Sequence, residues 1–325
     1  MITAYRSSGE ATVLPIENRL EALESDIVWL DLHMPSKDED SYVERLAGLD
    51  VPTRADLRDI EPSSRLYADE NATYMTASLL CHADSDKPVL TDVAFVLSGT
   101  RLVTVRYDDP KSFTLFPASM HRIPGGLKAG TDVLVRLMET IVDRTAEILE
   151  NAEVRGDKLL TQIFNDGGKH AHRPPRQLER LLVDISAHHR LVSKARDSLV
   201  SLARMMTFLQ AVPDIQAVRE NKELCRSVAR DIQSLSEHAG FISSNISFLL
   251  DATLGLINVE QNAIIKIFSI ASVVFLPPTL VASLYGMNFH FMPELDWSFG
   301  YPAALLAMLV SAVIPFFFFR WKGWL

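Results

Sequence analysis

Cysteine and basic residues are both scarce in this chain of 325 residues. Its two cysteines, Cys81 and Cys225, are too few for a disulfide framework and too far apart for a CxxC metal knuckle, which favours a reducing compartment. Lys and Arg number 32 against 41 Asp and Glu, so the net charge is -9. Nucleic-acid binding needs a basic face, so this charge argues against a nucleic-acid partner and favours cations.

Two segments near the C-terminus lack charge. Residues 267–293 and 299–319 contain no Asp, Glu, Lys or Arg. A bilayer span needs about 20 apolar residues, and both segments are long enough. A pair of buried core helices would have the same composition, but two such segments together favour the membrane. We therefore expect transmembrane spans at about 265–286 and 300–320.

Charged residues beside the two segments predict their orientation. Lys266 precedes the first span, Arg320 and Lys322 follow the second, and the connection 286–300 has neither Lys nor Arg. The positive-inside rule therefore places both termini in the cytoplasm. The N-terminal segment lacks the basic and apolar regions of a signal peptide, so we expect none.

The first part of the chain has the pattern of an α/β domain. Ser36 or Asp38 can cap a helix that runs through Leu49, and Thr53 with Asp56 resembles a second capped start. Short runs with β-branched or aromatic residues before and after these helical stretches predict strands. These runs are Ile27–Leu32, Tyr74–Cys81 and Leu102–Arg106.

Long helices are predicted after the breaker at 123–126. Thr131 can cap an apolar-periodic run to about Phe164, residues 165–176 have the composition of a loop, and a second long helix is expected at about 177–210. We therefore expect three parts. They are a cytoplasmic α/β domain at 1–125, a cytoplasmic long-helix and stalk region at 126–263, and a transmembrane domain at 264–325.

Two stripes of residues follow the segment that leads into the first span. Both are compatible with one helix of more than 60 residues that packs on its own chain along the first stripe and faces a symmetry axis along the second. The first stripe, called the seam, is Val228, Ile232, Leu235, Ala239, Ile242, Ile246 and Leu249. The second, called the axial stripe, is Asp251, Leu254, Asn258, Gln261, Ile265, Phe268, Ser272, Leu276, Thr279 and Ser283.

The polar residues of the first span allow two interpretations. Small hydroxyl side chains such as Ser272 can serve close helix packing or line a pore. Pro277 and Pro278 each remove a backbone donor, and carbonyls freed in this way are tolerated if they face protein or water. Two spans cannot enclose a path for an ion, so transport would require an oligomer. In such a ring Asp251 would place carboxylates near the cytoplasmic end of the pore, with Asn258 above it.

The connection between the spans carries a family resemblance. It begins Tyr285-Gly286-Met287-Asn288-Phe289 and continues Met292-Pro293-Glu294-Leu295. With the preceding run VVFLPPTLVASLYGMNF and the ending KGWL, it resembles the CorA family of magnesium channels, in its proteobacterial branch. The resemblance covers roughly residues 225–325 in detail.

The resemblance implies a fold and a function. The fold is an α+β membrane protein with an N-terminal α/β cytoplasmic domain and a long stalk helix that continues into the first of two C-terminal transmembrane helices. The function is a homopentameric channel of the cell inner membrane for Mg²⁺ influx, with Co²⁺ and Ni²⁺ as further substrates. Mg²⁺ would be both substrate and regulatory ligand, with no other cofactor.

The resemblance also implies roles for individual residues. Gly286, Met287 and Asn288 would form the selectivity mouth, where amide oxygens can bind the water shell of Mg²⁺. Glu294 and Asp296 would add negative potential there. Within the axial stripe, Thr279 and Ser283 would line the path, and Ile265, Phe268 and Leu276 would lie at its hydrophobic constrictions.

Cytoplasmic Mg²⁺ closes channels of this family by binding between subunits. Asp59 matches one carboxylate of that site, but Ser227 stands at the position of the stalk carboxylate. Asp231 and Glu223 are nearby substitutes for it.

The alternatives are a zinc-transporting relative, against which Met287 argues, and a membrane-tethered scaffold or sensor that conducts nothing. An enzyme is disfavoured, because the sequence has no phosphate loop, nucleophile elbow or HExxH arrangement.

Overall fold

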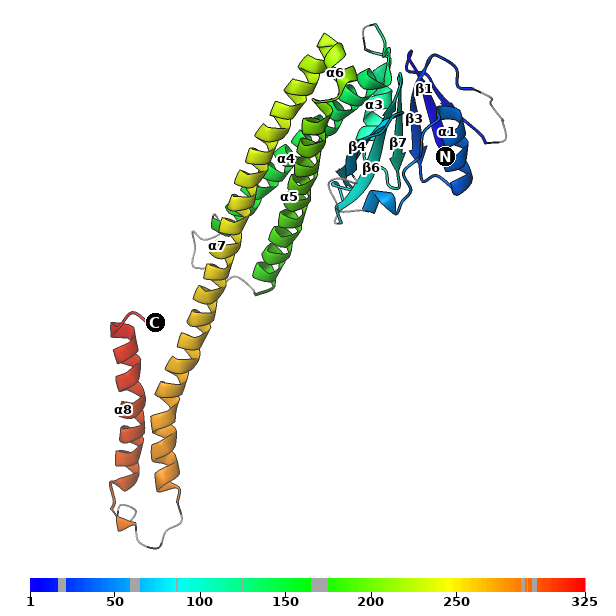
Figure 1. The fold of residues 1–325 in the computed structure, drawn as a ribbon. Coiled ribbons are helices and arrows are strands. Elements are labelled where there is room, and N and C mark those ends of the chain that lie inside the picture. Colours follow the sequence, from blue (N-terminus) through cyan, green and yellow to red (C-terminus); the bar gives the residue numbers. More distant parts are fainter. Residues whose placement is uncertain are drawn as a thin grey trace. The chain divides into compact units, whose positions relative to one another are not determined.

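The structure is a computed structural model of the whole chain. It describes all residues except 17–21, 59–64, 86, 124, 165–174, 288, 289, 291, 294–296 and 325. The chain divides into two compact units. The first unit comprises Met1–Gly167 and Arg180–Leu250, and the second comprises Gly168–Glu179 and Asp251–Leu325 (Figure 1).

A seven-stranded sheet forms the centre of the first unit, in the order β2-β1-β3-β7-β6-β5-β4. Its strands are β1 (Ile2–Arg6), β2 (Ala11–Val13), β3 (Ile27–His33), β4 (Leu66–Ala68), β5 (Thr73–Cys81), β6 (Val89–Ser98) and β7 (Arg101–Arg106). Strands β3 and β7 pair in parallel, and the other neighbours pair antiparallel. The three predicted strands are confirmed as β3, β5 and β7.

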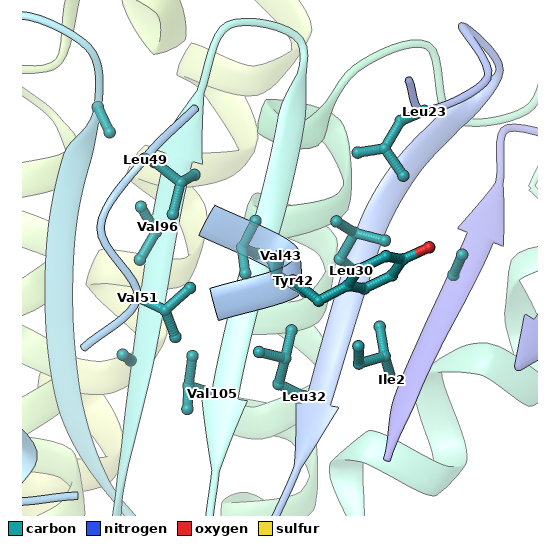
Figure 2. Close-up of a cluster of buried hydrophobic side chains, with 14 of the residues drawn as sticks. Ile2, Leu23, Leu30, Leu32, Tyr42, Val43, Leu49, Val51, Val96 and Val105 are labelled. Atoms are coloured by element: carbon teal, nitrogen blue, oxygen red, sulfur yellow. The ribbon is translucent and has the colours of Figure 1, made fainter. Parts of the chain in front are cut away.

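Helix α1 (Lys37–Ala47) covers one face of the sheet (Figure 2). Successive side chains of a strand point to opposite faces, so Leu30 and Leu32 of β3 lie on the same side. They share a core cluster with Tyr42 and Val43 of α1, and none of the four is more than 3% exposed. This buried apolar layer fixes α1 on the sheet.

Both helix starts predicted in this region have capping contacts. Ser36, and not Asp38, is the N-cap of α1, because its hydroxyl accepts the Glu39 N–H at 3.3 Å and the Glu39 carboxylate accepts the Ser36 N–H at 2.8 Å. The Thr53 hydroxyl donates to the Asp56 carboxylate at 2.7 Å. Only a short 3-10 turn, Asp56–Arg58, follows it among the described residues.

The opposite face of the sheet is covered by α3 (Ser112–Met120) and by α4 (Gly130–Phe164). Trp29 of β3 packs there against Phe113 and Phe116 of α3, with ring-centroid distances of 6.1 and 5.7 Å. The first unit therefore has a layer of helices on each side of the sheet.

The predicted cap of α4 at Thr131 is wrong. The helix begins one residue earlier, at Gly130. The Asp132 carboxylate caps it by accepting the backbone N–H groups of Lys128 and Ala129 at 2.8 and 3.1 Å. A Cβ atom at Gly130 would lie 2.2 Å from the carbonyl carbon of Arg101 in β7. Glycine therefore permits α4 to start directly against the sheet.

Long helices make up the rest of the first unit. Helix α5 (Pro175–Leu209) matches the predicted helix at 177–210, and the short α6 (Pro213–Ala217) separates it from α7 (Arg219–Tyr285). The predicted single helix of more than 60 residues is confirmed by α7, which has 67. The loop expected at 165–176 lies almost wholly outside the described residues.

The seam of α7 is the buried side of this helix, as predicted. Six of its seven residues are at most 3% exposed, and Leu235 is half-buried. Contacts with α4 run along the helix, from Arg136–Glu220 at 2.6 Å to the stacked rings of Phe164 and Phe248. The packed seam therefore leaves the opposite side of α7 free of its own chain.

The second unit contains the end of α7 and helix α8 (Gly300–Trp321). Each helix includes an 18-residue window long and apolar enough to cross a membrane, with mean hydropathies of 2.0 and 2.3, and only 6% of each window is buried. The half-buried residues of α8 recur every three or four positions. They are Gly300, Ala304, Met308, Ser311, Ala312, Pro315 and Phe319.

Candidate ion pathway and cation-binding sites

The axial stripe of α7 is exposed along its whole length in the single chain. Ile265, Phe268 and Leu276, for example, are 60%, 70% and 67% exposed, whereas the seam residues of the same helix are closed to solvent. Asp251 and Asn258 lie on the same exposed stripe, nearer the N-terminal end of α7. The rest of the chain therefore leaves the axial stripe uncovered. The stripe can line a path or contact a second copy.

Two hydroxyl groups of the axial stripe donate back to their own helix. The Ser272 hydroxyl donates to the Phe268 carbonyl at 2.9 Å, and the Thr279 hydroxyl donates to the Phe275 carbonyl at 2.5 Å. A hydroxyl that donates in this way keeps its oxygen lone pairs available as acceptors. The two exposed side chains therefore keep an oxygen acceptor on the exposed side of α7.

The helix ends just before the predicted selectivity mouth. The Gly286 N–H donates to the Ala282 carbonyl at 3.0 Å and closes the last turn of α7. A Cβ atom at Gly286 would lie 3.1 Å from that carbonyl oxygen, so a larger residue would crowd the turn. Met287 follows and is 44% exposed. Asn288, Glu294 and Asp296 lie outside the described residues.

The predicted regulatory residues are only partly described. Asp59 lies outside the described residues. Glu223 is paired with Arg219 at 2.8 Å on the exposed side of α7, and Ser227, one turn further on, is half-buried. Asp231 is exposed. The structure of one chain does not bring these residues together.

Asp231 instead lies near two carboxylates of α4 that the sequence analysis missed. Burial and the charges of Asp143 and Asp231 raise the pKa of Glu139, against the opposing charge of Arg136. Burial and the charge of Asp231 likewise raise the pKa of Asp143. The i, i+4 spacing of Glu139 and Asp143 is the sequence signal that could have found them. Within the described part of one chain, no three His, Cys, Asp or Glu residues are grouped to hold a metal ion.

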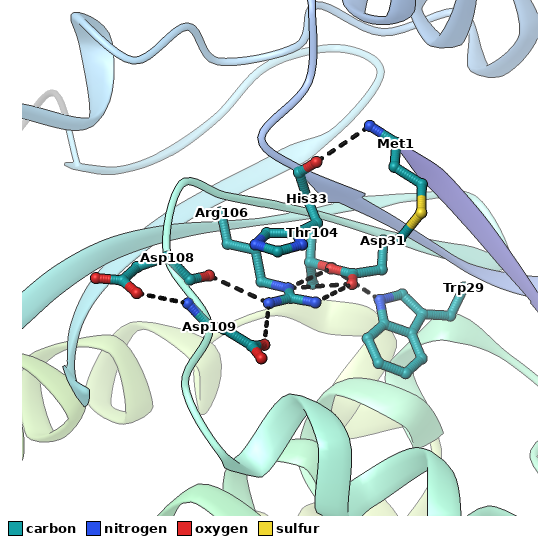
Figure 3. Close-up of polar contacts among 8 residues, drawn as sticks. All are labelled: Met1, Trp29, Asp31, His33, Thr104, Arg106, Asp108 and Asp109. Carbon is teal, nitrogen blue, oxygen red and sulfur yellow. Dashed lines mark hydrogen bonds and ion pairs between the residues drawn. The ribbon is translucent and has the colours of Figure 1, made fainter. Parts of the chain in front are cut away.

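A buried polar network occupies the carboxyl ends of the parallel strands β3 and β7 (Figure 3). The Arg106 guanidinium donates to Asp31 from Nη2 at 3.0 Å and to Asp109 from Nη1 at 2.5 Å. The Thr104 hydroxyl donates to Asp31 at 2.7 Å and accepts the Trp29 indole N–H at 2.9 Å. Open α/β sheets bind ligands at such strand ends, but here the chain's own groups fill the position. The network therefore stabilises the sheet.

Solved structures share this architecture. The CorA magnesium transporter from Methanocaldococcus jannaschii matches with a TM-score of 0.73 and 19% identity, over 100% of this chain and 99% of that one. The full-length CmaX protein matches with a TM-score of 0.68 and 17% identity, over 98% and 96% of the two chains. At these identities the likeness shows the fold, which agrees with the predicted fold class.

Sequence relatives extend the likeness over the full length. The Haemophilus ducreyi magnesium transport protein CorA is 35% identical over 100% of both chains, and its Escherichia coli K12 counterpart is 36% identical over 94% of this chain and 96% of its own. The family model described as CorA-like Mg²⁺ transporter protein matches residues 24–321. This chain, with its two apolar C-terminal helices, therefore belongs to the CorA family of membrane transporters.

Proposed function

We propose that this chain forms a homopentamer that carries Mg²⁺ into the cell along a path lined by the axial stripe. The observation that supports it most is the full-length similarity to bacterial proteins named for magnesium transport, 35% identical over 100% of both chains in one case. Two helices of one chain cannot enclose a path, so several copies must do so. The exposed stripe supplies one wall from each copy.

The entrance is formed by Gly286, Met287 and Asn288. Mg²⁺ gives up its water reluctantly, so a ring of Asn288 amide oxygens binds the hydrated ion by accepting hydrogen bonds from its water. Glu294 and Asp296 attract cations to this mouth through their negative potential. Co²⁺ and Ni²⁺ enter by the same route as secondary substrates.

Below the entrance, the axial stripe carries both oxygen-bearing and apolar residues. Ser283, Thr279 and Ser272 accept hydrogen bonds from the ion's water, in keeping with the helix-directed donation of the latter two hydroxyls. The apolar positions Leu276, Phe268 and Ile265 form the constrictions that can exclude water when the channel closes. Asn258 and Asp251 receive the ion at the cytoplasmic end.

Cytoplasmic Mg²⁺ closes the channel by binding between subunits. Asp59 contributes one carboxylate, and Glu223 or Asp231 replaces the carboxylate that Ser227 lacks. Asp231 is favoured, because Glu139 and Asp143 beside it already carry raised pKa values from burial and mutual repulsion. A divalent cation at that place offsets the repulsion. No resident cofactor is required.

The channel lies in the inner membrane with both termini in the cytoplasm. Lys266 before the first span and Arg320 and Lys322 after the second agree with the positive-inside rule.

The test is dye-reported Mg²⁺ uptake into proteoliposomes. Wild-type protein should transport, whereas Asn288→Ala should lose uptake and still assemble, because it removes the amide ring and leaves the helices intact. Glu294→Gln should reduce uptake less, since an exposed charge at the mouth acts through screened attraction.

Other results identify the alternatives. Wild-type uptake by the Asn288→Ala protein would refute the entrance assignment. Absence of any cation flux through the wild type would favour a non-conducting scaffold, and Zn²⁺ flux in place of Mg²⁺ flux would favour a zinc transporter.

A further inference from the structure

The C-terminal turn of α8 places the indole of Trp324 in a defined position. Gly323 adopts a left-handed conformation with φ +70, which lets the chain reverse after the helix. The backbone N–H of Trp324 donates to the Phe319 carbonyl at 3.0 Å, and the backbone N–H of Gly323 donates to the Arg320 carbonyl at 3.1 Å. This pair of bonds is a Schellman motif. The indole then stacks on the Phe319 ring, with centroids 5.5 Å apart.

The same indole contacts α7. The Lys266 ammonium nitrogen lies 5.9 Å from the centroid of the Trp324 ring, within the range of a cation–π interaction. Lys266 is the last charged residue of α7 before the uncharged segment 267–293. The contact therefore joins the end of α8 to the point where α7 becomes apolar.

Lys266 lies to one side of the axial stripe. It follows Ile265 of the stripe, and one residue turns a helix by about 100°. Ile270, one turn after Lys266 on the same side, is only 7% exposed and marks the covered side of α7. Lys266 is itself exposed, and Trp324 therefore holds its ammonium group on the side of the helix that faces the end of α8, away from the stripe.

We propose that Trp324 is a positioning residue for cation transport, because it keeps the Lys266 ammonium group out of the ion path. The lysine stem is long and flexible, so a released ammonium group can reach past Ile265 to the stripe. One such charge per subunit would repel Mg²⁺ at the cytoplasmic end of the path. The inference rests on the proposed function, since it requires the stripe to line the path.

The test compares initial rates of Mg²⁺ uptake by full-length variants in proteoliposomes. Trp324→Leu should lower the rate by about threefold to tenfold, the population shift expected from loss of a cation–π contact. Trp324→Phe retains an aromatic face and should keep most of the rate. Lys266→Gln should restore the rate of Trp324→Leu, because it removes the released charge. The matched control is Trp321→Leu, which removes a neighbouring indole that is 82% exposed.

Labelling of Lys266 by a water-soluble acetylating reagent that reacts with amines provides a readout independent of transport. The extent of labelling is measured by mass spectrometry. Trp324→Leu should increase this labelling and Trp321→Leu should not. Unchanged uptake and labelling in Trp324→Leu would overturn the inference, as would a slow Trp324→Leu protein that Lys266→Gln fails to restore. Either result in a preparation whose wild type transports Mg²⁺ leaves the proposed function intact, whereas a wild type without uptake refutes that function.

Discussion

Asp31 and Arg106 form an ion pair closed to solvent within the sheet, with side chains 4% and 8% exposed. Removing Asp31 leaves the buried Arg106 guanidinium with only the exposed Asp109 as a carboxylate partner, and breaking a buried pair in this way costs about 3–5 kcal/mol. We therefore expect Asp31→Leu to lower the free energy of unfolding by that amount. The measurement is native-state hydrogen exchange of the β3 and β7 amides in the full-length protein.

Two further variants make this prediction specific. The double variant Asp31→Leu with Arg106→Met should recover most of the loss, because it removes both charges. Glu223→Gln breaks the exposed pair with Arg219 and should cost only about 0.3–0.5 kcal/mol. Slow exchange at β3 that survives Asp31→Leu would contradict a stabilising role for the network.

Single residues differ in how far the sequence determines their role. Ser36 was predictable as a cap because the capping box is a local pattern. The cap of α4 was misassigned to Thr131, because the start of that helix is set by the approach of Gly130 to Arg101 in a distant strand. The Asp31–Arg106 pair joins residues 75 positions apart, so no local pattern reveals it.

Among the elements, the long helices and three of the strands were predictable. Heptad periodicity identified the seam, and the two stripes together predicted a single helix of more than 60 residues, as α7 is. Strands β2 and β4 have three residues each, too few to show alternation, and depend on pairing with a longer neighbour. Strand β6 buries five consecutive residues, so it has no period of two.

The packing of α5 between other helices creates an acid-sensitive position that the sequence does not show. His188 is 0% exposed, and neither ring nitrogen has a hydrogen-bond partner within the described residues. It lines a cavity of about 220 Å³ together with Glu153 and Asp157 of α4 and Asn245 of α7. Burial, with smaller effects from Arg155 and His189, lowers the pKa of His188 to about 4.

A lowered histidine pKa makes stability depend on pH in one direction. The unfolded chain binds the proton near pH 6.5, whereas the folded chain resists it down to about pH 4. The contribution of His188 to stability is therefore complete above pH 6.5 and falls by about 1.4 kcal/mol per pH unit between pH 6.5 and about pH 4. Unfolding of the full-length protein by urea between pH 7 and pH 4.5 should show this loss.

A matched pair of variants isolates the effect. His188→Gln should flatten the profile, and His189→Gln, which removes only a smaller influence on the His188 pKa, should change it slightly. If both variants keep the wild-type slope, the acid sensitivity has another origin.

At the scale of the whole molecule, charge links assembly to Mg²⁺. Residues 264–325 hold three of the 32 basic and two of the 41 acidic residues, which leaves -10 on the rest of each chain. In the proposed pentamer, five copies would concentrate this charge around one axis, and divalent ions between subunits would offset the repulsion. Native mass spectrometry in mild detergent should therefore show five chains. A stable dimer with full transport activity would contradict the pentamer.

Mg²⁺ should also protect the assembly from protease and suppress uptake when present inside the vesicle. Binding shifts the population towards the closed state only through its higher affinity for that state. Asp59→Asn should then require more Mg²⁺ for both protection and closure. If its Mg²⁺ titration matches that of the wild type, the sensor lies at other carboxylates, and Glu139 with Asp143 would be the next to change.

The candidate site was predictable in its pattern and not in its geometry. Helical periodicity alone places the axial residues from Asp251 to Ser283 on one stripe. These residues are exposed in the single chain, which agrees with that placement. The proposed pathway and intersubunit site would form only between copies, so one chain cannot display them. The carboxylates of α4 beside Asp231 emerged only from helix packing.

Whether the axial stripe lines the ion path is tested most directly by thiol modification. Cys81 and Cys225 are buried, and burial raises their pKa values to about 12 and about 11, so the native thiols stay unreactive. Thr279→Cys places a thiol on the axial stripe. Val281→Cys places a thiol two residues later, on the half-buried side of α7. A small cationic thiol reagent should block Mg²⁺ uptake by the Thr279→Cys protein and leave the Val281→Cys protein active. Equal block of both variants, or of neither, would contradict a path along this face of α7.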